Sequence, residues 1–341
     1  MTACTSTTAA AEEQSNLQTW LSHFDINEPV EQGIVEIGTT GAQASYAVYG
    51  DNDGPEILWV HGLPLNGTSW QPQLQHFQHR FRNIVVEMGG CGNTSRVPNG
   101  TGITDFDVDI CLAVLDHLNV TAPAMVGFAS GGHPVLRLAA QYPHRVSRLA
   151  VINSSPRFQT NGPHSDWPWG FNSTTVQHFQ QLLQTQNLTT VVTELLGPAL
   201  KDPCDETLVE FLKGVILDMA SKYATRTFWT DMCFDNDLDL MGNITAPALF
   251  VTSSLSTVVP VDVAYRLRTL VAGEAQVVEI PSADHFVQMT QAPLVNALLD
   301  QFISPKCHLY PTAAHNGGGG VGGGTNVAMH ERGATSTDVF A

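Results

Sequence analysis

The chain alternates short apolar runs with amphipathic segments from Gly33 onward, and this alternation limits the fold more than any other feature. Such a pattern is typical of a mostly parallel sheet flanked by helices. Most runs are continuously apolar, as expected where both faces of a sheet are buried. The chain is therefore predicted to have an α/β fold with one eight-stranded sheet. The expected strands are Ile34–Ile37, Ala44–Tyr49, Ile57–Val60, Asn83–Glu87, Ala124–Gly127, Leu149–Ile152, Ala248–Thr252 and Gln276–Ile280.

Several segments between these strands have helical periodicity. In Ile103–Leu118 the apolar residues recur at the spacing of one helix face, and Gly131–Tyr142 and Val295–Ile303 show a similar pattern. These three segments are predicted to be helices that cover the sheet.

The alternation stops between about Gln159 and Thr230, where the segments look wholly helical. Thr175–Gln186 and Glu206–Tyr223 are the clearest of them. We expect residues 159–230 to form a helical lid inserted into an α/β core made of residues 33–158 and 231–303.

The two ends of the chain have a different character from the core. Residues 1–32 are expected to be an N-terminal extension. After Ile303 the strand and helix pattern ends, and Gly317 to Gly324 is glycine apart from Val321. Such a composition buries too little surface to offset its ordering entropy. We predict that residues 304–341 form a flexible tail.

We expect neither a secretory signal nor a membrane span. Met1 to Ser15 lacks a basic start and an apolar run. No apolar stretch approaches the roughly 20 residues that cross a bilayer. The sequence favours a cytoplasmic protein without membrane contact.

The charge balance is strongly acidic. There are 15 Lys and Arg residues against 32 Asp and Glu residues, a formal net charge of -17, which repels phosphate backbones and anionic membranes. We therefore expect no nucleic-acid partner. No C-x-x-C pair is present, so the spacing suggests neither a zinc site nor a compact disulfide framework, and we expect free thiols. We also expect no metal and no cofactor. The cysteines are Cys4, Cys91, Cys111, Cys204, Cys233 and Cys307.

One turn stands out because it leads from an apolar strand directly into a helix. It reads Val-Gly-Phe-Ala-Ser-Gly-Gly from Val126 to Gly132, so small residues surround its centre. Small residues allow a strand and the following helix to approach closely. Further patterns lie at the ends of other strands. His-Gly-Leu-Pro from His61, Glu-Met-Gly-Gly-Cys-Gly from Glu87 and Ala-Asp-His-Phe from Ala283 come after strands, and Ile-Thr-Ala-Pro from Ile244 leads into one.

Together these patterns resemble the α/β-hydrolase fold, in particular its lidded esterases, enol-lactonases, C–C hydrolases and haloperoxidases. The resemblance covers roughly Gly33 to Ile303 and implies a pocket for a small apolar, ester-like or lactone-like molecule. It also implies an oxyanion hole made by the backbone N–H groups of Leu63 and Ser130. His285 is then the retained histidine of the catalytic triad.

The same resemblance places the nucleophile position at Ala129, and a methyl group cannot attack a carbonyl. A register shifted by one residue would make Ser130 the nucleophile. That register puts the bulky Phe128 two positions before the nucleophile and leaves Gly127 without a role. We therefore favour Ala129 as a vacant nucleophile position.

The acid of the triad is missing as well. The family segment Gly-x-x-Asp-x-x-x-Pro reads Ser253 to Pro260 here, so Ser256 stands at the acid position. Some relatives carry the acid one strand earlier, where this chain has Asn153, whose amide can orient an imidazole without stabilising its cation. Asp284 adjoins His285 but is interpreted as structural.

Other residues are expected to border the pocket by resemblance. Cys91 lies in a loop at the pocket edge without a predicted base, so we do not expect it to act as a nucleophile. Tryptophans in the lid can stack on a ligand, although such aromatics more often pack internally. The candidates for the pocket wall are His61, Phe128, Trp70, Asn153, Trp167, Trp229 and Phe286.

Three hypotheses for function follow. In the first, the chain binds a small molecule or acts as a scaffold without hydrolysis. In the second, His285 is a general base, and the N–H groups of Leu63 and Ser130 hold an enolate or alkoxide in lyase, cyclase or proton-abstraction chemistry. In the third, Ala129 replaces the serine of an ester or lactone hydrolase by engineering, which leaves Ser256 unexplained. A protein partner is possible but nothing in the sequence indicates one.

Overall fold

A computed structural model describes residues 15–200 and 206–304, and the fold is built from these residues. The predicted tail, apart from Ser304, and the first 14 residues lie outside this part of the chain. Among the described residues, no helix is both long enough and apolar enough to cross a membrane.

The core of the fold is one sheet of eight strands in the order β1-β2-β4-β3-β5-β6-β7-β8. β2 pairs antiparallel with β1 and with β4, and the remaining neighbours pair in parallel. All eight predicted strands are confirmed, with the largest difference at the start of the first. The strands are β1 (Glu31–Ile37), β2 (Ala42–Gly50), β3 (Glu56–Val60), β4 (Arg82–Val86), β5 (Ala124–Phe128), β6 (Arg148–Ile152), β7 (Ala248–Ser253) and β8 (Ala275–Ile280).

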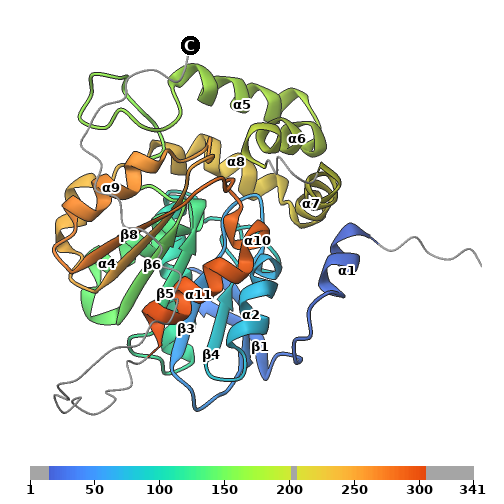
Figure 1. The fold of residues 1–341 in the computed structure, drawn as a ribbon, viewed down its shortest axis with the longest axis vertical. Coiled ribbons are helices and arrows are strands. Elements are labelled where there is room, and N and C mark those ends of the chain that lie inside the picture. Colours follow the sequence, from blue (N-terminus) through green and yellow to red (C-terminus); the bar gives the residue numbers. More distant parts are fainter. Residues whose placement is uncertain (1–14, 201–205, 305–341) are drawn as a thin grey trace, which may run out of the picture. The chain divides into compact units, whose positions relative to one another are not determined.

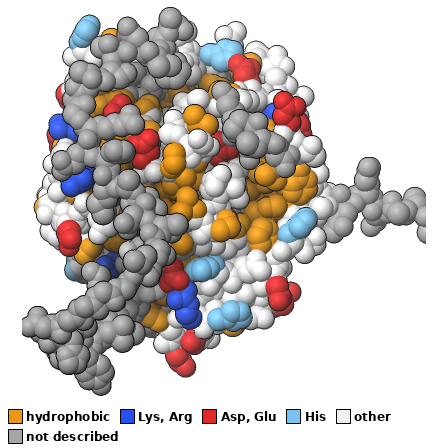
Figure 2. Space-filling view, in the orientation of Figure 1, with side chains coloured by type: hydrophobic (Ala, Val, Ile, Leu, Met, Phe, Trp, Pro, Cys, Tyr) orange, Lys and Arg blue, Asp and Glu red, His pale blue; other side chains and the backbone are white. Residues whose placement is uncertain are grey.

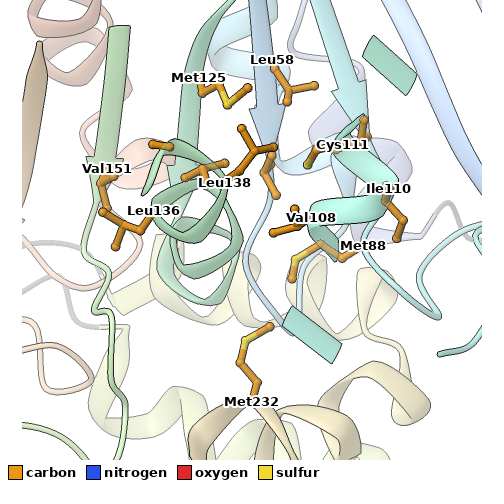
Figure 3. Close-up of a cluster of buried hydrophobic side chains, with 14 of the residues drawn as sticks. Leu58, Met88, Val108, Ile110, Cys111, Met125, Leu136, Leu138, Val151 and Met232 are labelled. Atoms are coloured by element: carbon orange, nitrogen blue, oxygen red, sulfur yellow. The ribbon is translucent and has the colours of Figure 1, made fainter. Parts of the chain in front are cut away.

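Helices cover both faces of the sheet because its strands are apolar on both sides. Leu58 of β3 belongs to one buried cluster and Trp59 to the other, as the alternation of side chains along a strand requires. The first cluster includes side chains of α3 (Ile103–His117), α4 (Gly132–Gln141) and α9 (Val261–Leu270). Figure 3 shows part of it, with β-strand, α3 and α4 side chains facing one another.

The second cluster lies on the opposite face of the sheet. It is formed with α2 (Gln71–Phe77) and α11 (Ala292–Ile303), which contact each other. Short helical turns connect the larger elements. They are α1 (Asn16–Leu21), η1 (Gly67–Trp70), η2 (Ala129–Gly131), η3 (Pro143–Arg145), η4 (Met232–Phe234), η5 (Leu238–Asn243) and α10 (Val287–Thr290).

Between β6 and β7 the described residues form four further helices. Figure 1 shows α5, α6 and α7 grouped together beyond the ends of the strands. The predicted helix Glu206–Tyr223 is wrong in its length, because two helices occupy this stretch. The Ser221 hydroxyl accepts a hydrogen bond from the Ala224 N–H and begins a new helix, as a serine N-cap does. The four are α5 (Ser173–Thr185), α6 (Leu188–Ala199), α7 (Glu206–Met219) and α8 (Lys222–Thr230).

The N-terminal segment packs on this inserted region. The Leu17 N–H donates to the Asp218 carboxylate of α7 at 3.0 Å, and Trp20 is buried in the second cluster. The Asn27 N–H then donates to the Gln78 side chain at 3.0 Å. The described part of the predicted extension thus connects α7 with the core.

A buried ionic network fixes α4, the helix that follows the glycine-rich turn. Asp237 accepts hydrogen bonds of 2.8 and 2.9 Å from Arg137, and its carboxylate lies 2.8 Å from Nε2 of His133. Because Asp237 precedes η5, the network joins the end of the inserted region to the start of α4.

The face drawn in Figure 2 carries hydrophobic patches among acidic and polar side chains, while its Lys and Arg side chains are scattered. Several large hydrophobic side chains of the described residues are exposed. They are Val30, Ile34, Tyr142, Phe234, Leu255, Tyr265 and Leu294.

The turn after β5 packs directly against the end of β3. A Cβ atom added at Gly131 would lie 2.1 Å from the carbonyl oxygen of His61 and 2.6 Å from that of Val60. Real Cβ atoms essentially never approach a backbone oxygen so closely. Only glycine therefore fits at this position without moving a strand.

We predict that Gly131→Ala lowers the free energy of unfolding by at least about 2 kcal/mol, because two backbone carbonyls must shift. Urea denaturation measures this difference. Gly242→Ala is the matched control: a Cβ atom added there has only the Leu270 carbonyl oxygen within 4 Å, at 3.9 Å, so alanine should change the free energy of unfolding by less than about 0.5 kcal/mol. Equal effects of the two changes would contradict the close packing at the turn.

Candidate functional site

The strand-to-helix turn holds Ala129 in a left-handed backbone conformation. Its φ is 47°, between the last residue of β5 and the first residue of α4. A non-glycine residue rarely adopts this conformation, and where it does the strain marks a constrained site. Ser130 is not among the residues with positive φ. Ala129, and not Ser130, is therefore the residue at the apex of the turn.

His285 lies in the loop after β8, and its ring is hydrogen-bonded to Ser256. The Ser256 hydroxyl is 3.0 Å from Nδ1 of His285 and also accepts a hydrogen bond from the Val259 N–H at 3.2 Å. His285 is 3% exposed, and burial lowers its pKa to about 3. The imidazole is therefore neutral at physiological pH.

The two predicted oxyanion-hole residues lie together, but in an arrangement that the sequence does not suggest. The Leu63 N–H donates a 2.7 Å hydrogen bond to the side-chain oxygen of Ser130. The Ser130 N–H lies in the first turn of η2, where a helix offers no acceptor for its N–H groups. One of the two expected donors is thus already bound by a side chain.

A pocket with about 490 Å³ of empty space, part of it open to solvent, connects these groups with the inserted helices. Its polar lining residues are Ser130, His285 and Thr225, and the Thr225 hydroxyl donates to the carbonyl of Ser221 at 2.7 Å. The rest of the wall is apolar and largely aromatic. The lining residues are Leu63, Pro64, Ala129, Ser130, Phe158, Phe171, Leu195, Ala199, Thr225, Phe228, Trp229, Val258, His285 and Phe286.

The end of α6 is fastened to the loops that carry the polar groups. The His285 N–H donates to the carbonyl of Ala199 at 3.1 Å, and the Thr257 hydroxyl donates to the carbonyl of Pro198 at 3.0 Å. Because Ala199 also lines the cavity, these bonds hold part of the cavity wall against the histidine loop.

Three residues predicted to line the cavity are instead buried and contact the loops and strands that form its wall. Nε2 of His61 accepts a hydrogen bond from the Met88 N–H at 3.1 Å. Phe128 is fully buried, with its ring centre 5.1 Å from that of His285. The Asn153 amide donates to the His285 carbonyl at 2.8 Å, so Asn153 holds the backbone of the histidine and not its ring.

The predictions for Trp70 and Trp167 are also wrong, because both rings are packed internally. Trp70 is fully buried against Trp59 in the second cluster. The Trp167 indole donates to the carbonyl of Arg157 at 3.1 Å. Of the three tryptophans proposed for the wall, Trp229 alone lies there, stacked on Phe179.

Sequence reasoning missed most of the aromatic wall. Thr225, Phe228 and Trp229 have the i, i+3, i+4 spacing of one helix face, so this part was detectable in α8. Phe158 and Phe171 come from irregular chain around the isolated bridge between Gln159 and Phe171, where no periodicity marks a buried side chain.

Two other polar candidates stay outside the cavity wall. The carboxylate of Asp284 accepts a hydrogen bond from the Thr290 hydroxyl at 3.0 Å. Cys91 is buried, and burial raises the pKa of its thiol well above the usual value, so it is a poor nucleophile. Among residues 15–200 and 206–304, no group of three His, Cys, Asp or Glu side chains is arranged to hold a metal ion.

Comparison with known proteins identifies relatives over most of the chain. Residues 55–292 match the family model for the alpha/beta hydrolase fold. The pimeloyl-(acyl-carrier protein) methyl ester esterase of Aliivibrio fischeri is 26% identical over 259 residues, which are 74% of this chain and 93% of that protein. The 3-oxoadipate enol-lactonase 2 of Acinetobacter baylyi is 25% identical over 185 residues, 53% of this chain and 64% of that protein.

Solved structures share the fold at lower identity. A bromoperoxidase from Bacillus anthracis superposes with a TM-score of 0.70 at 19% identity, covering 80% of this chain and 99% of its own. An enol-lactonase from Burkholderia xenovorans gives a TM-score of 0.69 at 18% identity with the same coverage. At these identities the likeness extends to the fold alone.

The lowered pKa of His285 predicts a specific pH dependence of stability. The unfolded chain binds a proton at this histidine near pH 6.5, whereas the folded protein does so only near pH 3. The contribution of neutral His285 to the free energy of unfolding is therefore complete above about pH 6.5. It is lost as the pH falls toward 3, and the free energy of unfolding then decreases by at most about 1.4 kcal/mol per pH unit.

Urea denaturation of the wild type and of His285→Gln between pH 7 and pH 4 measures this effect. The wild type should lose stability relative to the variant as the pH falls, since glutamine does not titrate. All other groups titrate in both proteins and cancel in the difference. A difference that stays constant with pH would contradict a buried, neutral His285.

Proposed function

Because the chain belongs to the alpha/beta hydrolase fold family, we propose that it is a non-hydrolytic member that binds a small, largely apolar molecule. The observation that carries this proposal is the methyl side chain of Ala129 at the strained apex of the turn after β5. In hydrolases of this fold the apex residue supplies the nucleophile. Alanine has no atom that can form an acyl intermediate.

The partner of His285 supports the same proposal. A triad carboxylate holds the imidazole in one tautomer and stabilises the cation that forms when it takes a proton. The Ser256 hydroxyl is neutral and can either donate to Nδ1 or accept from it. His285, with a pKa of about 3 and no charged partner in this bond, is a weak base.

The cavity suits an apolar ligand with one polar group. Its wall is mostly aliphatic and aromatic, with Ser130, His285 and Thr225 as the polar lining residues. Such pockets bind by apolar contact and orient the ligand by a few polar groups. Relatives named as an ester esterase and an enol-lactonase suggest that the ligand resembles a small ester or lactone.

The alternative in which His285 abstracts a proton has less support. It requires a competent base and two N–H donors for the developing oxyanion. Here burial weakens the base, and the Leu63 N–H is bound to Ser130. Binding without chemistry therefore accounts for more of the observed contacts.

We predict that the wild type binds 2-naphthyl acetate without hydrolysing it. Binding should quench the fluorescence of Trp229, and the signal should be absent in Trp229→Phe. Chromatography should recover the ester intact, with hydrolysis no faster than the residual ~10³–10⁴-fold acceleration over water that a triad-depleted site retains.

Restoring the nucleophile separates the binding hypothesis from a hydrolase that lacks only its serine. Ala129→Ser should remain within about tenfold of the wild type, because the acid is still missing, whereas Ala129→Ser with Ser256→Asp should gain at least about a hundredfold. Adding His285→Ala should remove that gain. Rapid hydrolysis by the wild type, or by Ala129→Ser alone, would overturn the proposal.

A further inference from the structure

We propose that Ser130 determines the class of ligand: its side chain occupies the Leu63 N–H, so the cavity selects neutral molecules with a hydrogen-bond acceptor over anions. This inference rests on the proposed binding function. It assigns to Ser130 a role for its side chain that differs from the backbone role implied by the fold.

The hydrogen bonding of the Ser130 side chain leaves its hydroxyl hydrogen for a ligand. Its oxygen accepts the 2.7 Å bond from the Leu63 N–H. Among the described residues, no acceptor receives the hydroxyl hydrogen of Ser130, although the side chain is only 3% exposed and lines the cavity. A buried hydroxyl without an acceptor is costly. The O–H group is thus available to a ligand carbonyl, ether or hydroxyl oxygen.

The same contact weakens the site for anions. Two N–H groups at the start of a helix stabilise a negative charge, as in an oxyanion hole. With the Leu63 N–H bound to Ser130, only the Ser130 N–H remains of that pair, and the Ser130 O–H is the second donor beside it. A carboxylate placed here would exchange its hydration for fewer hydrogen bonds than it needs.

No other group in the described wall compensates an anion. The lining residues include no Lys, Arg, Asp or Glu, and His285 is the only titratable side chain among them. An isolated charge in an apolar cavity is strongly disfavoured unless it is paired. A neutral ketone or ester loses much less on entering, and one O–H donor satisfies its carbonyl.

Two probes with the same ring system test this selection. 2-Acetylnaphthalene is a neutral ketone and 2-naphthoate is an anion at pH 7. Calorimetric titration of the wild type should give a Kd for the ketone at least about tenfold lower than for the carboxylate. Ser130→Ala exchanges the hydroxyl donor for the Leu63 N–H and so restores two backbone N–H groups at the start of a helix, which favour a negative charge. The ratio of the two Kd values should therefore shift toward the carboxylate by about threefold or more.

Two further variants keep the test decisive. Ser130→Gly removes the same hydroxyl with a different effect on the backbone, so the same shift in both variants assigns it to the loss of the hydroxyl and not to the backbone. Thr227→Val is the matched control: this hydroxyl of α8 donates to the carbonyl of Ala224 and does not line the cavity, so the ratio should stay unchanged.

The outcomes separate this inference from the proposal beneath it. Equal affinities of the wild type for both probes, or an unchanged ratio in the Ser130 variants, would overturn the role of Ser130 while leaving binding in place. Failure of the folded wild type to bind either probe would overturn the binding function itself, and the selection with it.

Discussion

The site depends on one junction, where the chain turns from β5 into α4 while touching the end of β3. Ala129 accepts a left-handed backbone there, at a cost of about 1–3 kcal/mol for such strain. Gly131 allows the turn to lie against the carbonyl of His61, where a Cβ atom has no room. This contact brings the Leu63 loop within hydrogen-bonding distance of Ser130. The turn therefore has the backbone geometry that presents a nucleophile in hydrolases of this fold, but its apex carries the methyl group of Ala129, which cannot react.

The surroundings of His285 likewise keep the geometry expected of a catalytic triad but differ from it in chemistry. Ser256 lies where it can orient His285, at 3.0 Å from Nδ1, but offers a hydroxyl in place of a charge. Asn153 secures the carbonyl of the histidine, and Ala199 accepts its N–H. The imidazole is thus well positioned and neutral. In the proposed function it serves as a polar contact at the end of an apolar cavity and not as a base.

Much of the fold was predictable because its signals are local. Buried parallel strands are short apolar runs, so the eight strands were found within a few residues of their observed bounds. The segment around Ser221 shows the limit of this approach. The helical periodicity of the sequence continues through Ser221, although the Ser221 hydroxyl caps the start of a new helix there. Periodicity cannot distinguish one long helix from two that pack with the same face inward.

The site was less predictable because it depends on side chains that meet across the fold. The positions of Ser256 after β7 and of His285 after β8 were enough to predict that the two residues lie close together, because neighbouring parallel strands end at the same edge of the sheet. The bond between Ser130 and Leu63 depends on a side-chain conformation chosen by packing, which no motif encodes. Trp70 and Trp167 failed as wall residues for a similar reason, because a large aromatic side chain is as suitable for a core as for a pocket.

The most direct test of the central claim is a crystal structure of the wild type soaked with 2-naphthyl acetate. The account predicts an intact, non-covalent ester in the cavity, with its rings against Phe228 and Trp229 and its carbonyl oxygen within hydrogen-bonding distance of the Ser130 hydroxyl. An acyl group attached to any side chain, or hydrolysis products in the cavity, would contradict it.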